Sequence, residues 1–263
     1  MALSGRTVLL TGASGGIGSA LCDALVGAGA RVVAVGRNED RLQPLVQRHG
    51  AARVVSLAAD LATDGGRAHV VDRVSRLQPT PSVLVLAHAQ SAFGLFEDQS
   101  PNALQALVET NLVGPMQLIH ALLPTLRGHE RAAVVAVGST FGSLAFPGFA
   151  AYSATKFGLR GLMEGLSREY ADTGLRFQYL SPRATRTAFN SPQVEAMNRE
   201  MKVAQDDPGD VAARLVSAIA DGRPRLQLGW PEKLFARING ALPGLVDRNL
   251  KTQLPIVRRH ARS

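Results

Sequence analysis

The chain has 263 residues, a hydrophobic fraction of 46% and a formal net charge of +8. It is long enough for one large α/β domain with a sizeable core, and no run of about 18 apolar residues predicts a membrane-spanning helix. Cys22 is the only cysteine, which excludes an internal disulfide. Because the residues after Met1 also lack a secretory signal pattern, we expect a cytoplasmic protein.

The basic charge is concentrated towards the C-terminus. Residues 223–263 hold nine Lys or Arg against Glu232 and Asp247, a balance of +7 that leaves +1 for the remaining residues. The body therefore lacks the basic surface that is typical of nucleic-acid binding, and we expect no nucleic-acid partner.

The first predicted element is the apolar strand Thr7–Leu10, which leads into a glycine-rich turn and then a helix. Glycines in such a turn let backbone N–H groups approach phosphates, and the dipole of the following helix favours an anion. A strand, a glycine turn and a helix in this order predict a pyrophosphate-binding cradle. The candidate cofactor-binding residues of this turn are Thr11, Gly12, Ser14, Gly16, Ile17 and Gly18.

The second predicted strand, Arg31–Val35, ends without an acidic residue. Dinucleotide folds that prefer NAD place Asp or Glu there, to bind the ribose 2′-hydroxyl. Here Gly36 and Arg37 follow the strand, and a guanidinium group suits a 2′-phosphate because it can bind two oxygens at once. We therefore predict NADP(H) as cofactor, with Ser14 as a further hydroxyl contact. The alternative for Arg37 is a solvated loop charge.

Two more strands and a capped helix are predicted before the middle of the chain. Val54–Leu57 and Val83–Leu86 are short apolar runs typical of buried strands. Ser100-Pro101 is a strong helix start, because a capping hydroxyl precedes a proline at the first helical position. This helix contains Asn111, and Gly114-Pro115 predicts a bend close to it.

A possible acid catalyst follows the fifth predicted strand, Val134–Val137. Ser139 lies just past the end of this strand, and Tyr152 and Lys156 are four residues apart on the next helix, so they share one face. A free tyrosine titrates near pH ~10, and an adjacent ammonium group is expected to lower that pKa. Ser139 is placed to hydrogen-bond the oxygen that Tyr152 protonates. Taken alone, a Tyr-x-x-x-Lys pair is a weak signal and fits an ordinary helix surface better than an active site.

Together these motifs resemble the short-chain dehydrogenase/reductase family in its classical form, over about residues 5–229. The residues that match the family's glycine motif are Thr11, Gly12, Gly16 and Gly18. Those that match its active-site Asn, Ser, Tyr and Lys are Asn111, Ser139, Tyr152 and Lys156. The resemblance implies an α/β fold, a Rossmann-like, doubly wound parallel sheet of about seven strands in a single domain, with ligands at its carboxyl edge.

The resemblance also implies roles for individual residues. Lys156 would hold the cofactor ribose as well as act on Tyr152, and Asn111 would bind a water that relays protons to Lys156. Asp60 would face the adenine, although it also fits the N-cap of the next helix and both can hold. Thr187 would meet the nicotinamide amide. No metal site is predicted.

Two departures from the family pattern stand out. Where the family has Asn-Asn-Ala-Gly, this chain has Leu86-Ala87-His88-Ala89, and we interpret His88 as a hydrogen-bonded structural residue. Where the family has Pro-Gly after the sixth strand, Leu175–Leu180, this chain has Pro182-Arg183. Arg183 and Arg186 either contact an anionic part of the cofactor or substrate, or are solvated loop charges.

The Tyr152 helix carries a face of small residues, namely Ala154, Gly158, Gly161 and Gly165. Interior glycines weaken a helix by about 1 kcal/mol each, so close packing should compensate. In the family this helix and the Asn111 helix form a dimer interface. The resemblance therefore implies a homodimer or a homotetramer.

Residues 230–263 are expected to form a basic, amphipathic extension of the domain at residues 1–229. Leu234, Phe235, Ile238 and Leu242 share one helical face, and a second amphipathic piece follows. Apolar faces with basic flanks can lie on anionic membranes, which would place the protein at the inner face of a membrane. The alternative is a tail packed on the body or on a second copy.

The predicted function is NADPH-dependent interconversion of a ketone and a secondary alcohol, a small-molecule oxidoreductase activity. The variable segment Ala188–Asp207 contains Met and Phe side chains that suit an apolar, flexible substrate, or plain packing. With the tail, it favours a lipid-like ketone of lipid metabolism, such as a 3-oxoacyl chain or a sphingoid-type ketone. The alternative is a non-catalytic NADP(H)-binding regulator or scaffold on the same fold.

Overall fold

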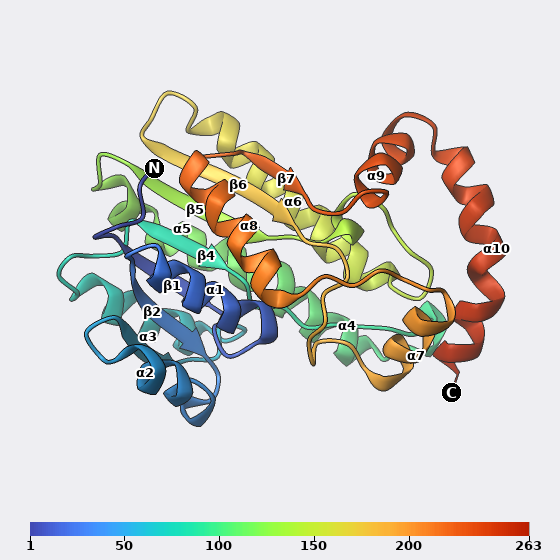
Figure 1. Ribbon diagram of the computed structural model, residues 1–263, viewed down its shortest axis with the longest axis horizontal. Helices are drawn as coiled ribbons and strands as arrows, with labels where there is room; N and C mark the ends of the chain where they lie inside the picture. The colour runs from blue at the N-terminus through green and yellow to red at the C-terminus, as the bar shows by residue number, and fades with distance from the viewer. Residues whose placement is uncertain (263) are drawn as a thin grey trace.

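The apolar runs of the sequence become the strands of one parallel sheet. The computed structural model describes residues 1–262, and its sheet has seven strands in the order β3-β2-β1-β4-β5-β6-β7 (Figure 1). The strands are β1 (Thr7–Thr11), β2 (Arg31–Gly36), β3 (Val54–Ala58), β4 (Val83–Leu86), β5 (Ala132–Val137), β6 (Leu175–Ser181) and β7 (Arg225–Gln227). The strand order reverses between β1 and β4, which opens a ligand crevice at the carboxyl ends of these strands. The predicted Rossmann-like fold is confirmed.

Helices cover both faces of the sheet, as parallel strands with two apolar faces require. They are α1 (Gly16–Gly27), α2 (Gln43–His49), α3 (Asp64–Ser75), α4 (Pro101–Val108), α5 (Gly114–Arg127), α6 (Ala150–Glu169), α7 (Pro192–Glu200), α8 (Pro208–Asp221), α9 (Glu232–Ala241) and α10 (Pro243–Ala261). One core lies between the sheet and α1, α2 and α8, and a second lies between the sheet and α3, α5 and α6. Successive side chains of β1 point to opposite faces of the sheet, so Leu10 packs in the first core and Leu9 in the second.

The helix starts follow their capping residues. Ser100 accepts a hydrogen bond from the backbone N–H of Ala103 at 3.2 Å, which confirms the predicted start of α4. The N-cap of α3 is Thr63, whose hydroxyl accepts from Gly66, so the alternative of Asp60 as that cap is wrong. The Asp60 side chain instead accepts from the N–H of Ala62, ahead of the first turn of α3.

The predicted bend near Asn111 takes the form of a π-helical segment, Glu109–Val113, between α4 and α5. Gly114 follows it, and a Cβ at this position would lie 2.7 Å from the backbone oxygen of Leu61. Glycine is therefore needed for the close approach of this helix to the loop after β3. The wider turn of a π-segment turns Asn111 inwards, where it is buried.

The C-terminal helices pack on the body instead of standing free. In Figure 1, α9 and α10 lie at the right of the sheet, with α7 beside the last turns of α10. Val246 and Val257 of α10 are buried, and the α10 residues Arg259 and His260 both pair with Glu200 of α7. These contacts support the alternative in which the tail packs on the body. Within residues 1–262, no helix combines the length and the apolar character that crossing a bilayer requires.

Candidate active site

The glycine turn forms a cradle in which side chains have no room. Gly12 has a φ of +67°, and a Cβ there would lie 2.6 Å from the backbone nitrogen of His88. A Cβ on Gly16 would overlap the side chain of Thr187, which lies across the cradle. Helix α1 begins at Gly16 and its N-cap, Gly15, contributes no side-chain cap. Its first N–H groups therefore face an open turn that fits a pyrophosphate.

Gly36 ends β2, and Arg37 and Arg41 follow it in the chain. A Cβ on Gly36 would lie 3.0 Å from Oγ of Ser14, so a larger residue at this position would displace Ser14. Arg37 and Arg41 both line the cavity beside these residues. Asp60 lines it as well, with Oδ1 accepting from the N–H of Ala62 at 3.1 Å. Sequence reasoning missed Arg41, although its position four residues after Arg37 on the following turn was a usable signal.

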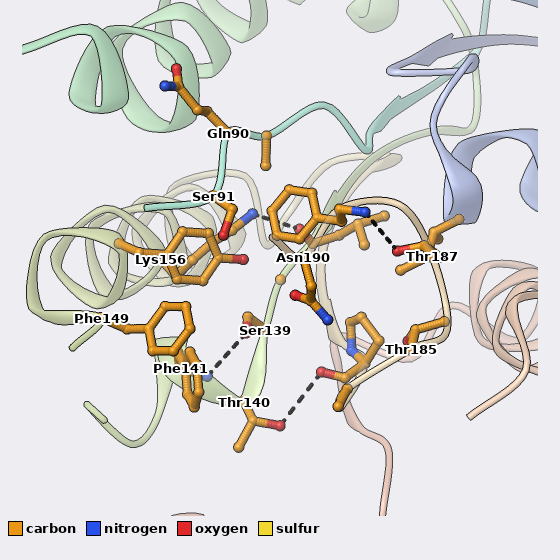
Figure 2. A pocket seen from close by; sticks show the side chains of 18 of the residues that line it. Gln90, Ser91, Ser139, Thr140, Phe141, Phe149, Lys156, Thr185, Thr187 and Asn190 are labelled. Carbon is orange, nitrogen blue, oxygen red and sulfur yellow. Dashed lines mark hydrogen bonds between the residues drawn. The ribbon is translucent and has the colours of Figure 1, made fainter. Parts of the chain in front are cut away.

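Ser139, Tyr152 and Lys156 meet at the carboxyl end of β5. Ser139 follows the strand, and its Oγ accepts from the N–H of Phe141 at 3.1 Å (Figure 2). Tyr152 and Lys156 lie on the first turns of α6 and both are buried. Nζ of Lys156 donates to the Val137 carbonyl at 3.2 Å and lies 5.7 Å from the centre of the Tyr152 ring. All three side chains line the same cavity.

Burial shifts the pKa values of Tyr152 and Lys156. Burial raises the pKa of the Tyr152 phenol above its usual range, and the Ser139 side chain only partly opposes that rise. Burial also lowers the pKa of Lys156 to about 8. The expected net lowering of the Tyr152 pKa is therefore wrong. The physical reason is that burial of the phenol itself disfavours the charged phenolate.

The altered turn after β4 is held by two side chains from elsewhere. His88 Nδ1 lies 2.6 Å from Oγ1 of Thr11, in agreement with its interpretation as a hydrogen-bonded structural histidine. Asn111 accepts from the N–H of Gln90 at 2.7 Å and donates to the Gln90 carbonyl at 2.9 Å. It also donates to Oγ1 of Thr155 at 3.2 Å. The Asn111 side chain thus clamps the turn, and each of its polar atoms has a protein partner.

The cavity is continuous from the glycine cradle to an apolar chamber, with a volume of about 1080 Å³. Phe141, Phe149 and Phe189 surround the Tyr152 ring, with centroid separations of 6.3, 6.3 and 6.2 Å. Met197 and Met201 also line it, as sequence reasoning expected of the segment that holds them. Figure 2 shows Ser139 and Lys156 on one side of this space and Thr187 on the other.

The two arginines after β6 are both paired. Arg183 binds Asp206 with Nη2 and Oδ1 2.6 Å apart, and its Nη1 lies 3.5 Å from Oε2 of Glu232. Arg186 lies 3.5 Å from Asp207 at the surface. Arg183 is therefore neither a solvated charge nor free for an anion. Its partners are remote in sequence, and no signal in the sequence identified them.

Sequence reasoning also missed the part that the C-terminal helices play in the cavity. Phe235 of α9 and Val246 and Leu250 of α10 line it. Among residues 1–262, no three or more His, Cys, Asp or Glu side chains gather in a way that would hold a metal ion.

Comparisons with known proteins agree with this geometry. A family model described as "short chain dehydrogenase" matches residues 6–198. The chain is 33% identical over 190 residues to the 3-dehydrosphinganine reductase TSC10B of Arabidopsis thaliana, with 69% of this chain and 56% of that protein covered.

Two similar solved structures contain different nicotinamide cofactors, one NADPH and the other NAD. A short-chain dehydrogenase from Sphingobium yanoikuyae in complex with NADPH is 25% identical, with a TM-score of 0.79 and 92% and 95% of the two chains covered. A short chain dehydrogenase/reductase from Burkholderia phymatum in complex with NAD has a TM-score of 0.83 at 20% identity, with 93% and 96% covered, and so supports the fold.

Proposed function

The chain belongs to the short chain dehydrogenase family, and on that premise we propose that it interconverts a ketone and a secondary alcohol with NADPH or NADP. The observation that carries the proposal is the group formed by Ser139, just past β5, and the buried side chains of Tyr152 and Lys156. These side chains share one cavity with a glycine cradle that fits a dinucleotide. When bound, the nicotinamide would supply or accept the hydride.

The proposed proton donor is Tyr152. Because burial raises its pKa, the phenol holds its proton at neutral pH until a substrate oxygen gains negative charge. Oγ of Ser139 accepts from Phe141 and lies beside Tyr152, so its own hydrogen can be donated to that oxygen. Lys156, with a pKa of about 8, can return a proton to Tyr152 near neutral pH and hold the cofactor ribose.

Asn111 has a narrower proposed role than the resemblance implied. Its side chain is fully bonded to Gln90 and Thr155, so a water that relays protons to Lys156 would have to use the Asn111 backbone in the π-segment. We therefore assign the side chain to positioning the turn after β4. The water relay stays a proposal.

For the cofactor, we propose a preference for NADP(H). A side chain on Gly36 would crowd Ser14, and Arg37 and Arg41 line the cavity beyond the end of β2, where dinucleotide folds hold the adenosine ribose. Asp60 and Thr187 are proposed contacts at the adenine and nicotinamide ends. Two guanidinium groups near this place favour a doubly charged phosphate over a hydroxyl.

The proposed substrate is a lipid-like ketone, such as a 3-oxoacyl chain or a sphingoid-type ketone. The apolar chamber beyond Tyr152 is lined by Phe141, Phe149 and Met197, which suit a flexible hydrocarbon chain. The Arabidopsis relative is named a 3-dehydrosphinganine reductase, which agrees with a substrate of this class. For a substrate of this class, we propose that the enzyme lies in the cytoplasm or peripherally at the inner face of a membrane.

The rival function is a non-catalytic NADP(H)-binding regulator or scaffold. It is motivated by the altered turns at His88 and Arg183, but His88 is bonded to Thr11, Arg183 is bonded to Asp206, and Ser139, Tyr152 and Lys156 line one cavity. The experiment is a screen of carbonyl compounds for oxidation of NADPH. Turnover of any ketone supports the enzyme, whereas tight NADPH binding with no turnover across the screen supports the regulator.

We also propose that the protein is a homodimer or homotetramer. A Cβ on Gly161 or Gly165 of α6 would meet nothing within 4 Å, so this face of the helix is open. Phe157 on α6 and Met116 on α5 are exposed apolar side chains nearby on the same layer. Sedimentation equilibrium would test the number of subunits.

A further inference from the structure

Helices α9 and α10 form a wall of the cavity. Both helices are amphipathic, and their apolar residues Phe235, Val246 and Leu250 line the chamber. Val246 is only 3% exposed, so this face of α10 is used in packing. The opposite side of α10 carries exposed basic residues such as Arg248 and Lys251. Part of the apolar face of the extension thus lines the chamber, and the basic residues of α10 are exposed to solvent.

Arg183 ties the beginning of this wall to the sheet. It follows β6, and it bridges Asp206 at 2.6 Å and Glu232, the first residue of α9, at 3.5 Å. The three side chains are 20%, 18% and 23% exposed, so the charges are largely removed from water. A Cβ on Gly229 would lie 2.7 Å from Cδ of Arg183, which shows how closely the chain passes this side chain.

Two further contacts fix the wall at other points. Nδ2 of Asn239 in α9 donates to the carbonyl of Ser143 at 3.1 Å, in the loop that follows Ser139. Arg259 and His260 near the end of α10 pair with Glu200 of α7. The wall is therefore attached to β6, to the loop beyond Ser139 and to α7. Of these attachments, only the one at Arg183 joins three segments of the chain.

We propose that α9 and α10 form the specificity-determining wall of the substrate site, and that Arg183 is the residue that positions this wall. The proposal rests on the proposed function for the use of the chamber. Phe235, Val246 and Leu250 contact the distal part of an apolar substrate, beyond the carbonyl that faces Tyr152. A short ketone does not reach them, so the wall contributes to the binding of long chains only.

The test removes one charge from the bridge and compares it with a matched change on the same wall. Glu232→Gln leaves Arg183 with one partner and weakens the attachment of α9, since a partly buried charge pair loses its attraction. Asp247→Asn makes the same chemical change on exposed α10, where Asp247 has no ion pair within residues 1–262. Phe235→Ala removes a wall contact and keeps the bridge intact.

Two readouts separate the wall from the chemistry. In kinetics with NADPH, Glu232→Gln and Phe235→Ala should raise KM for 2-undecanone about tenfold, a loss of about 1.4 kcal/mol, and leave KM for 2-butanone within about twofold. In hydrogen exchange, Glu232→Gln should speed the exchange of α9 amides about tenfold. Asp247→Asn should match the wild type in both measurements.

Each result either supports the proposal or overturns a named part of it. Unchanged α9 exchange in Glu232→Gln would overturn the positioning role of Arg183. An equal rise of KM for both ketones would overturn the wall as a specificity element. If neither ketone is reduced, the proposed function loses support for this class, and hydrogen exchange of α9 and α10 with and without 2-undecanone then tests the chamber directly. Absence of protection of these helices by the ketone would count against the wall.

Discussion

Oγ1 of Thr11 and Nδ1 of His88 lie 2.6 Å apart and join the glycine turn to the turn after β4. The same hydroxyl accepts from the N–H of Ala87 at 3.2 Å, so Thr11 organises the altered turn from below. Burial lowers the pKa of His88 to about 4, with the Lys156 charge as a second cause. His88 is therefore neutral in the folded protein at neutral pH, and protonation would place a charge between the two turns.

This geometry predicts a loss of stability on acidification. The pKa of His88 is about 4 in the folded protein and 6.5 for a free histidine, so between these values the unfolded chain binds the additional proton. Stability should therefore fall as the pH drops from 6.5 to 4, by up to about 3 kcal/mol from this group. The free energy of unfolding by urea, measured across this range, checks the prediction.

The matched variants are His88→Asn and His69→Asn. The first removes the buried imidazole, so the slope of stability against pH between 4 and 6.5 should become shallower, whatever the change in stability at pH 7. The second removes an exposed histidine of α3 and should keep the wild-type slope. A slope that is the same in all three proteins would show that His88 is not the titrating group.

The second prediction concerns the proton donor. Tyr152→Phe keeps the ring and its packing against Phe141, Phe149 and Phe189 but removes the proton, so turnover should fall by at least 100-fold. The NADPH dissociation constant should change by less than about threefold. Tyr170→Phe, on a ring that packs against Phe177 away from the cavity, should keep turnover. If Tyr152→Phe keeps a tenth or more of wild-type turnover, Tyr152 is not the proton donor.

Local patterns were enough to predict most of the fold. The boundaries of β4, the capped start of α4 and the start of α6 at Ala150 all follow from apolar runs, caps and prolines within a few residues. The shared position of Ser139 and Lys156 also follows, because Ser139 comes just after a strand and Lys156 lies in the second turn of the next helix. These features depend on neighbours in sequence.

What could not be predicted depends on segments that meet only in the fold. Arg183 finds its partner Glu232 on α9 because β6 and α9 are brought together, and no spacing in the sequence encodes that meeting. The direction of the Tyr152 pKa depends on burial by aromatic rings from other segments. The apolar residues of α10 fit either a membrane or the body on sequence alone, because the chamber that they line forms only in the fold.

The third prediction concerns the cofactor. A charge-assisted contact with a 2′-phosphate is worth about 1.5–3 kcal/mol, so Arg37→Ala should weaken NADPH roughly 10- to 150-fold and leave NADH little changed. Arg41→Ala should act in the same direction, because both residues line the cavity there. Arg73→Ala, an exposed arginine of α3, is the control. The measurement is titration of the protein with each nucleotide, and wild-type NADH binding as tight as NADPH binding would exclude the preference.

The fourth prediction concerns a membrane and uses the outer side of the C-terminal helices. Trp230, Leu242 and Leu245 are 69%, 59% and 57% exposed, at the start of α9 and at the turn between the two helices. Arg237, Arg248 and Lys251 are exposed basic residues without an ion pair within residues 1–262. Each basic residue near an anionic surface contributes about 1 kcal/mol, and this contribution weakens as salt rises.

The protein should therefore sediment with phosphatidylserine-containing vesicles at low salt and be partly released at high salt. Truncation after Gly229 is a poor test, because it would uncover the chamber that Val246 and Val257 help to close. The double variant Leu242→Ser and Leu245→Ser alters exposed side chains only, and it should bind these vesicles at least tenfold more weakly while keeping the wild-type melting temperature. Neutral phosphatidylcholine vesicles should bind neither protein. If wild type and variant sediment equally, or neither sediments at low salt, the outer surface is not a membrane contact, and the proposal of a lipid-like substrate then depends on the chamber alone.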